Sequence, residues 1–249
     1  MKKWKKINLL VFIAVVVVLA FLTYALSSMD FSSPFGKPWH LLPSVHEDSL
    51  SQKYLEEYRI LNNKSLFRQM YDSSQVNVFI LVDVWGVPID ETLLESDFSL
   101  FKDIPHKFAR HQRLANRTKH AERVEFRNAV SGNVYLFGGD STEYDRPTYI
   151  KEIGFDKMVF CQKCNDSVMI SKMDSVLVED SLKFVAWTSQ SSRLGDRDSL
   201  QMSLRRIADF AKRHPGLRII VHGTHRPVLG TPETRNAYKS HWVPVVILN

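Results

Sequence analysis

The sequence predicts an α/β domain whose mostly parallel sheet has helices on both faces, preceded by one N-terminal transmembrane helix. The segment VNVFILVDVW at residues 76–85 is a nearly continuous apolar run, which is typical of a strand covered on both faces. Further along, the amphipathic segment 198–213 lies between the apolar segments 184–188 and 217–222. A strand, a helix and a strand within about 40 residues form a βαβ unit, which belongs to a parallel sheet.

The basic charge of the chain is concentrated at its N-terminus. The formal net charge is +6, and four of these charges come from the lysines at positions 2, 3, 5 and 6. The rest of the chain is therefore close to neutral and offers no basic face for a phosphate backbone, so we do not expect nucleic acid as a partner.

Residues 7–26, INLLVFIAVVVVLAFLTYAL, carry no charge and are long enough to span a bilayer. The lysines before them predict that residues 1–6 form a cytoplasmic tail and that the later residues are extracytoplasmic, either periplasmic or extracellular. A signal peptide cleaved near Ala25-Leu26-Ser27 is the alternative, but its apolar region is usually only about 7–15 residues. We therefore expect a single-pass anchor in the cell membrane, with the lipid bilayer as the partner of residues 7–26.

Residues 27–74 are expected to form a linker and a helical spacer. Prolines 34, 38 and 43 predict an extended linker, and apolar residues at helical intervals predict a helix over Asp48 to Tyr71, with a break near Asn62-Asn63. The α/β domain then occupies residues 75–249. Besides the strands named above, apolar runs predict strands at 133–137 and 243–248, and Asp198 is the expected N-cap of the helix 198–213.

The polar, basic span Lys107 to Arg127 is expected to be a solvated face, with His106, His111 and His120 exposed. Cys161 and Cys164 form a CQKC motif, whose spacing permits a local disulfide in an exported protein, with two free thiols as the alternative. A zinc ribbon would need a second cysteine pair, which the sequence lacks.

Candidate site residues follow the predicted strands, because ligands of open α/β sheets bind beyond the carboxyl ends of strands. Asp83 closes the predicted strand that begins at residue 76, and His222, Thr224 and His225 lie at or just after the end of the predicted strand 217–222. Carboxylate, imidazole and hydroxyl groups together suit one divalent metal, zinc or manganese. The alternatives are that Asp83 caps a turn and that the histidines are hydrogen-bonded loop residues. The sequence lacks the G-x-S-x-G elbow of serine hydrolases.

The segment FILVDVWGVP at 79–88 resembles the first strand of the alkaline-phosphatase/sulfatase superfamily, in particular of its membrane-bound envelope branch of lipoteichoic acid synthases and phosphoethanolamine transferases. VEFRNAVSG at 124–132 and YLFGGDSTEYDRPTYIKEIGF at 135–155 are similar to its middle segments, and IIVHGTH at 219–225 with HWVP at 241–244 to its late strand. The likeness keeps this order from about residue 75 to residue 249.

The resemblance implies roles for individual residues. Asp83 takes the place of the first acidic metal ligand, and Thr118 that of the threonine nucleophile. His225 matches the histidine of the Asp-His-Gly motif, while Thr224 stands where the family has a metal-binding aspartate. The resemblance also makes His241 a substrate-binding candidate. His222, two residues before Thr224, is a candidate substitute ligand.

Departures from the family pattern decide the expected function. A hydroxyl at Thr224 removes a negative charge from the metal site, Arg226 replaces a glycine, and Thr188-Ser189-Gln190-Ser191 lacks the histidine of a Ser-x-His segment. We expect a shortened fold with an eroded site, in an envelope protein that binds a lipid or glycan headgroup with little or no catalysis. The alternative is an active metal-dependent phosphoryl or sulfuryl ester hydrolase or transferase that uses Thr118, Asp83 and His225.

Overall fold

The computed structural model describes residues 15–20, 56–58, 65–113, 117–126, 133–139, 153–162, 164–178, 184–189, 196–228 and 231–248. The chain divides into two units, Met1–Glu47 and Asp48–Asn249. In the first unit, residues 15–20 are helical, and the rest of the predicted span 7–26 lies outside the described residues. Among the described residues, no helix combines the length and the apolar character that crossing a membrane requires.

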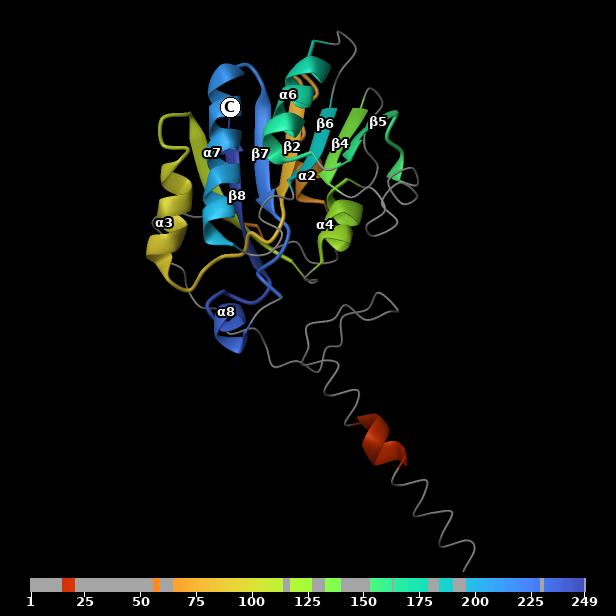
Figure 1. The fold of residues 1–249 in the computed structure, drawn as a ribbon, viewed down its shortest axis with the longest axis vertical. Helices are drawn as coiled ribbons and strands as arrows, with labels where there is room; N and C mark the ends of the chain where they lie inside the picture. Colours follow the sequence, from red (N-terminus) through yellow and green to blue (C-terminus); the bar gives the residue numbers. More distant parts are fainter. Residues whose placement is uncertain are drawn as a thin grey trace, which may run out of the picture. The chain divides into compact units, whose positions relative to one another are not determined.

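The second unit is built on an eight-stranded sheet with the order β1-β3-β8-β7-β2-β6-β4-β5 (Figure 1). Strand β8 pairs antiparallel with β3 and β7, and every other neighbouring pair is parallel, which confirms the predicted mostly parallel sheet. The strands are β1 (Glu56–Tyr58), β2 (Asn77–Val82), β3 (His106–Gln112), β4 (Asn133–Gly139), β5 (Lys157–Gln162), β6 (Phe184–Ser189), β7 (Arg218–Gly223) and β8 (Trp242–Leu248).

Both faces of the sheet are covered, because side chains alternate along each strand. Val78, Ile80 and Val82 of the central strand β2 pack in one core cluster, whose other members include residues of α3 (Glu91–Ser99), α6 (Asp166–Val176) and α7 (Arg197–Arg213). Phe79 and Leu81 pack on the opposite face with residues of α2 (Leu66–Met70) and α4 (Thr118–Glu125). A further short helix, α8 (Pro232–Asn236), precedes β8. The double coverage explains why β2 reads as a continuous apolar run.

Five of the predicted strands are present, as β2, β4, β6, β7 and β8, and the predicted βαβ unit is β6-α7-β7. Helix α7 buries Leu204 and Ile207 and carries Lys212 and Arg213 in its last turn. Its N-cap is Asp196, whose side chain accepts a hydrogen bond from the Ser199 N–H, so the expected cap at Asp198 is wrong by two residues.

The predicted helix over Asp48 to Tyr71 is only partly correct. Residues 56–58 form the edge strand β1, which pairs with β3, and the helix is confirmed only over α2. A strand that short is specified by its partner rather than by its own periodicity, so the sequence pattern did not reveal it. The remaining residues of 27–64 lie outside the described part.

The expected solvated face at 107–127 is only partly correct. Lys107, Arg117 and Arg123 are exposed, but the span also contains β3 and α4, and several of its charged or imidazole side chains are buried, among them Arg110, His111, Arg113 and Glu125. His106 is exposed as predicted, whereas His120 is half-buried. The polar residues are internal because several of them pair with one another across β3 and α4, as the site below shows.

Cys161, in β5, and Cys164, just before α6, are joined by a disulfide. The disulfide closes the short connection between an edge strand and the helix that follows it. Both cysteines are partly buried against the core on the α6 side of the sheet.

Candidate functional site

Asp83 lies directly after β2, at the carboxyl edge of the parallel strands, and its side chain is buried. One carboxylate oxygen, Oδ1, accepts three hydrogen bonds. The Thr118 hydroxyl donates over 2.5 Å, the Thr224 hydroxyl over 2.9 Å and the Val84 backbone N–H over 3.1 Å. These contacts define the Asp83 site, which we take as Asp83, Thr118, Thr224 and His225.

Three elements bring this site together. The Asp83 N–H donates to the carbonyl of Ser189 at the end of β6, and the Thr224 N–H donates to the carbonyl of Val82. Parallel pairing of β2 with β6 and β7 therefore fixes Asp83 and Thr224 at the same edge. Thr118 reaches them from the α4 side, as the first residue of that helix.

His225 completes the Asp83 site from the loop after β7. Its Nδ1 lies 2.7 Å from the Arg226 carbonyl oxygen, so Nδ1 is assigned as the donor of this hydrogen bond. Nε2 lies 3.4 Å from the Thr118 hydroxyl oxygen and 3.6 Å from Asp83 Oδ1. The imidazole thus faces the same hydroxyl that donates to the carboxylate.

The backbone around Asp83 is unusually constrained. Val84 has φ 54°, a left-handed conformation that is costly for a β-branched residue, and its N–H points at both Asp83 Oδ1 and the Thr224 hydroxyl oxygen. A Cβ on Gly223 would lie 2.0 Å from the Trp85 carbonyl oxygen, and one on Gly86 would lie 2.6 Å from the Arg226 Cα. Glycine at these two positions lets the loops after β2 and β7 pass in direct contact.

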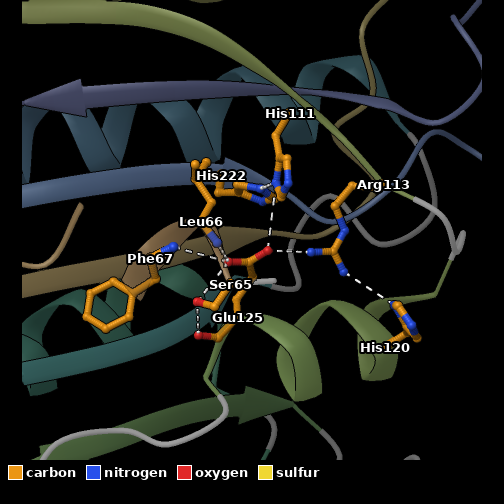
Figure 2. Close-up of polar contacts among 8 residues, drawn as sticks. All are labelled: Ser65, Leu66, Phe67, His111, Arg113, His120, Glu125 and His222. Carbon is orange, nitrogen blue, oxygen red and sulfur yellow. Dashed lines mark hydrogen bonds and ion pairs between the residues drawn. The ribbon is translucent and has the colours of Figure 1, made fainter. Parts of the chain in front are cut away.

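A second polar cluster lies on the same face of the sheet, at the other end of α4. His111 of β3, Glu125 of α4 and His222 of β7 each offer one ligand atom, and these atoms lie within 4.8 Å of one another (Figure 2). His111 Nδ1 is 2.7 Å from His222 Nε2 and 3.7 Å from Glu125 Oε1. We call these three residues, with Arg113, the inner cluster.

Glu125 is the centre of the inner cluster. Its Oε1 accepts a 2.6 Å hydrogen bond from Arg113 NH1, and its Oε2 accepts one of 2.8 Å from the Leu66 N–H at the start of α2. The Phe67 N–H and the Ser65 hydroxyl also approach Oε2, each at 3.3 Å (Figure 2). The carboxylate of α4 therefore caps the N-terminus of α2 and pairs with a guanidinium of the β3 end at the same time.

Burial dominates the electrostatics of the inner cluster. Burial raises the pKa of Glu125 and lowers the pKa of Arg113, and their mutual contact opposes both changes. Arg113 stays charged, because a guanidinium is not deprotonated in proteins, and the contact with it favours the charged form of Glu125. Burial, with a smaller contribution from Arg113, lowers the pKa of His111 to about 3, and burial also holds the pKa of His222 well below its usual value. Both imidazoles are therefore neutral at physiological pH.

The sequence matches no family model and no curated protein. Solved structures do match. A protein in the alkaline phosphatase superfamily from Vibrio parahaemolyticus aligns with a TM-score of 0.53 at 14% identity, over 70% of this chain and 60% of that one. The lipoteichoic acid synthase LtaP from Listeria monocytogenes aligns with a TM-score of 0.52 at 10% identity, over 71% of this chain and 65% of that one. The chain has the alkaline-phosphatase-superfamily fold.

The same fold recurs in the phosphoglycerol transferase GacH of Streptococcus pyogenes, solved in complex with sn-glycerol-1-phosphate. GacH aligns with a TM-score of 0.52 at 11% identity, over 73% of this chain and 70% of that one. The present chain covers less than two thirds of the Listeria and Vibrio proteins. These likenesses confirm, at the level of the fold, the resemblance inferred from the segments around Asp83 and His225.

Within this alkaline-phosphatase-type fold, the structure brings together four of the six predicted site residues, Asp83, Thr118, Thr224 and His225. His222 lies in the inner cluster instead, in contact with His111. His241 exchanges hydrogen bonds with Arg113, accepting from its N–H at 2.6 Å and donating from Nδ1 to its carbonyl at 3.0 Å. His241 thus closes the β3–β8 pair, at a left-handed φ of 64°.

Thr188 and Ser189, at the end of the predicted strand 184–188, make contacts within the fold. The Ser189 hydroxyl donates to Asp166 Oδ2 over 2.5 Å, and the Ser203 hydroxyl donates to the same oxygen over 2.7 Å. The Thr188 hydroxyl is 3.2 Å from the Tyr135 hydroxyl. Ser191 lies outside the described residues.

The Asp83 site does not fit the divalent metal that the alkaline-phosphatase-type fold implies. It offers one carboxylate, one imidazole and two hydroxyls, so Asp83 is the one anionic ligand among its four residues. Asp83 Oδ1 already accepts three protein hydrogen bonds, and the Thr224 hydroxyl both donates to Asp83 and accepts from Val84. These donors occupy the lone pairs of Oδ1, so this oxygen is already satisfied within the protein.

Three members of the inner cluster, His111, Arg113 and Glu125, were not singled out from the sequence as site residues. Glu125 looks like one of several charges on an amphipathic helix, and His111 lies in HKFARHQ, which has few apolar residues. Only the strand order β3-β8-β7 brings His111 beside His222, which is 111 positions away. No local signal in the sequence reports that juxtaposition.

Proposed function

We propose that the chain is a membrane-anchored, extracytoplasmic protein of the cell envelope that binds a lipid or glycan headgroup and performs little or no metal-dependent catalysis. The observation that carries the proposal is the hydrogen bonding of Asp83. Two threonine hydroxyls and a backbone amide satisfy Oδ1 of its carboxylate within the protein.

Charge supports this reading of the site. A catalytic metal in phosphoryl transfer needs anionic ligands to hold it and to activate the attacking group. Thr224 contributes a neutral hydroxyl beside Asp83, where a second carboxylate would add negative charge. The Thr118 hydroxyl oxygen and His225 Nε2 remain as hydrogen-bonding groups for a polar headgroup at the sheet edge, because the Thr224 hydroxyl already donates to Asp83 and accepts from Val84.

The envelope location rests on the N-terminal sequence. Residues 7–26 are uncharged and apolar, and the lysines before them favour a cytoplasmic N-terminus. Protease added to intact spheroplasts should digest the chain beyond residue 26 and leave a cytoplasmic control protein intact. Protection of the domain in intact spheroplasts, with digestion after lysis, would overturn the location.

The metal content of the purified full-length chain tests the site. We expect well below one equivalent of zinc or manganese by mass spectrometry after incubation with either ion. Thr224→Asp restores a second carboxylate and should bind the ion, whereas the matched control Thr224→Asn, of the same shape but uncharged, should not. Stoichiometric metal in the unmodified chain that is lost in Asp83→Asn would overturn the proposal.

Headgroup binding needs its own probe. Calorimetric titration with sn-glycerol-1-phosphate or O-phosphoethanolamine, in the presence of a chelator, should give saturable binding that Thr118→Val weakens. Valine matches threonine in shape and removes only the hydroxyl. Absence of binding for both probes, with the chain folded, would count against a phosphorylated headgroup as the ligand.

One observation favours an active enzyme as the alternative. The Thr118 hydroxyl lies at the start of α4, 2.5 Å from Asp83 Oδ1 and 3.4 Å from His225 Nε2, as a nucleophile beside an acid and an imidazole would. Metal-dependent release of p-nitrophenol from a phosphodiester, abolished by Thr118→Val, would establish that alternative. We expect no release above that of the Thr118→Val variant.

A further inference from the structure

The inner cluster has the side chains of a metal site and also contains a fixed organic cation. His111, Glu125 and His222 are each at most 2% exposed, and their ligand atoms lie within 4.8 Å of one another. Two imidazoles and one carboxylate are a common ligand set for zinc in proteins. Arg113, only 3% exposed, places NH1 2.6 Å from Glu125 Oε1.

We propose that the Arg113 guanidinium is the resident cation of a latent His-His-Glu metal site and supplies to Glu125 the positive charge that a zinc-class ion would otherwise supply. The proposal concerns residues other than the Asp83 site and does not depend on the proposed function.

The contacts of Glu125 support this assignment. Its Oε2 is oriented by the N–H groups of Leu66 and Phe67, which fixes the direction of Oε1. Carboxylates that ligate metals are usually held in this way by hydrogen bonds to the second oxygen. Here the fixed Oε1 points at the guanidinium of Arg113 instead of at an ion.

The charge balance explains why the guanidinium keeps a metal out. Arg113 and Glu125 carry opposite charges and lie in contact, so the guanidinium already balances the carboxylate of the cluster. A divalent ion would add two positive charges next to a guanidinium, in a region with almost no solvent to screen them. With Arg113 in place, the site therefore selects against the metal that its other ligands suit.

The histidines are able to serve as ligands once the guanidinium is gone. For both facing nitrogens to carry lone pairs, the protons must lie on the far nitrogens, which are His111 Nε2 and His222 Nδ1. In the described structure His222 Nδ1 is buried and has no hydrogen-bond partner, so moving the proton there breaks no bond at that atom. The exchange breaks the 2.7 Å hydrogen bond between the two rings.

Arg113→Met tests the proposal, because methionine fills a similar space without charge. The full-length chain, stripped with a chelator, is titrated with Co²⁺, whose visible absorption reports a tetrahedral nitrogen and oxygen site. We expect stoichiometric binding in Arg113→Met, none in the unmodified chain and none in the charge-conserving control Arg113→Lys. The double variant Arg113→Met/Glu125→Gln should lose the ion again.

Thermal unfolding with and without Zn²⁺ covers the case in which Arg113→Met is unstable. We expect zinc to raise the melting temperature of this variant and to leave that of the unmodified chain unchanged. An Arg113→Met chain that is folded but binds no Co²⁺, or that stays unfolded at every zinc concentration, overturns the proposal. So does an ion in the unmodified chain that Glu125→Gln removes. Thr224→Asp acts at the other site, so its result is read independently.

Discussion

The Asp83 site and the inner cluster hold a buried carboxylate on the same face of the sheet in two different ways. Asp83 is held by neutral donors, two hydroxyls and one amide, at the carboxyl edge of the strands. Glu125 lies deeper, is fully buried, and pairs with the guanidinium of Arg113 as well as with the N-terminus of α2.

The difference indicates which of the two buried carboxylates should contribute more to the stability of the fold. A carboxylate held by neutral donors leaves no charge behind when it is neutralised. A carboxylate in an ion pair leaves its partner buried and unpaired, which costs much more. The inner cluster should therefore dominate stability, and the Asp83 site should tolerate change.

The largest expected effect is that of Glu125→Gln. The substitution keeps the shape and leaves Arg113 buried without its counter-charge, so the free energy of unfolding should fall by about 3–5 kcal/mol. Urea unfolding of the purified chain measures it, with Glu95→Gln on the exposed face of α3 as the control for the same chemical change. A loss no larger than that of the control would break the comparison.

Acidification should have the next largest effect, through the buried histidines. The pKa of His111 is about 3 in the folded chain and near 6.5 in the unfolded chain. Below pH 6.5 the unfolded chain therefore binds more protons than the folded chain does. The contribution of neutral His111 to the free energy of unfolding is fully present above pH 6.5 and is lost as the pH falls toward 3. Between pH 7 and pH 5 the free energy of unfolding should fall by about 2 kcal/mol through this residue.

The measurement is the difference between the unmodified chain and His111→Gln, which removes the titrating group and cancels the contributions of other residues. The variant should lose about 2 kcal/mol less than the unmodified chain over the same pH range. Parallel pH profiles for the two proteins would show that His111 takes up its proton in the folded state.

The smallest expected effect is that of Asp83→Asn. An amide oxygen still accepts from Thr118, Thr224 and Val84, so only the extra strength of bonds to a charged acceptor is lost, about 1 kcal/mol. Urea unfolding under the conditions used for Glu125→Gln gives the ratio of the two effects. Equal losses at Asp83 and Glu125 would mean that Asp83 is compensated by a cation.

The sequence predicted the part of the fold in which each element carries its own signal. Strands β2 and β7 are apolar runs, α7 has an apolar stripe, and Asp83 and Thr224 follow strands. The residues of the Asp83 site were therefore within reach of a reading that combined strand ends with a family resemblance.

The inner cluster was out of reach for a physical reason. In the sequence, Arg113 and Glu125 look like surface residues because both are charged. Their burial is tolerable only because they form an ion pair, and the two partners belong to different segments of the chain. His111 and His222 become neighbours only through the strand order. Likewise, residues 56–58 form a short edge strand rather than the predicted helix because they pair with β3.

Strand β8 comes after every other strand of the sheet in the chain, yet it lies between β3 and β7. During synthesis from the N-terminus, more than a hundred residues are added after β3 before its antiparallel neighbour β8 is made. Until β8 is in place, no strand connects β3 to β7 by hydrogen bonds. Such non-local closure makes folding slow and leaves strand edges open to wrong pairing. The inner cluster, with one histidine on each side of β8, is thus completed only at the last step of sheet assembly, and its formation would report that the nascent domain has closed.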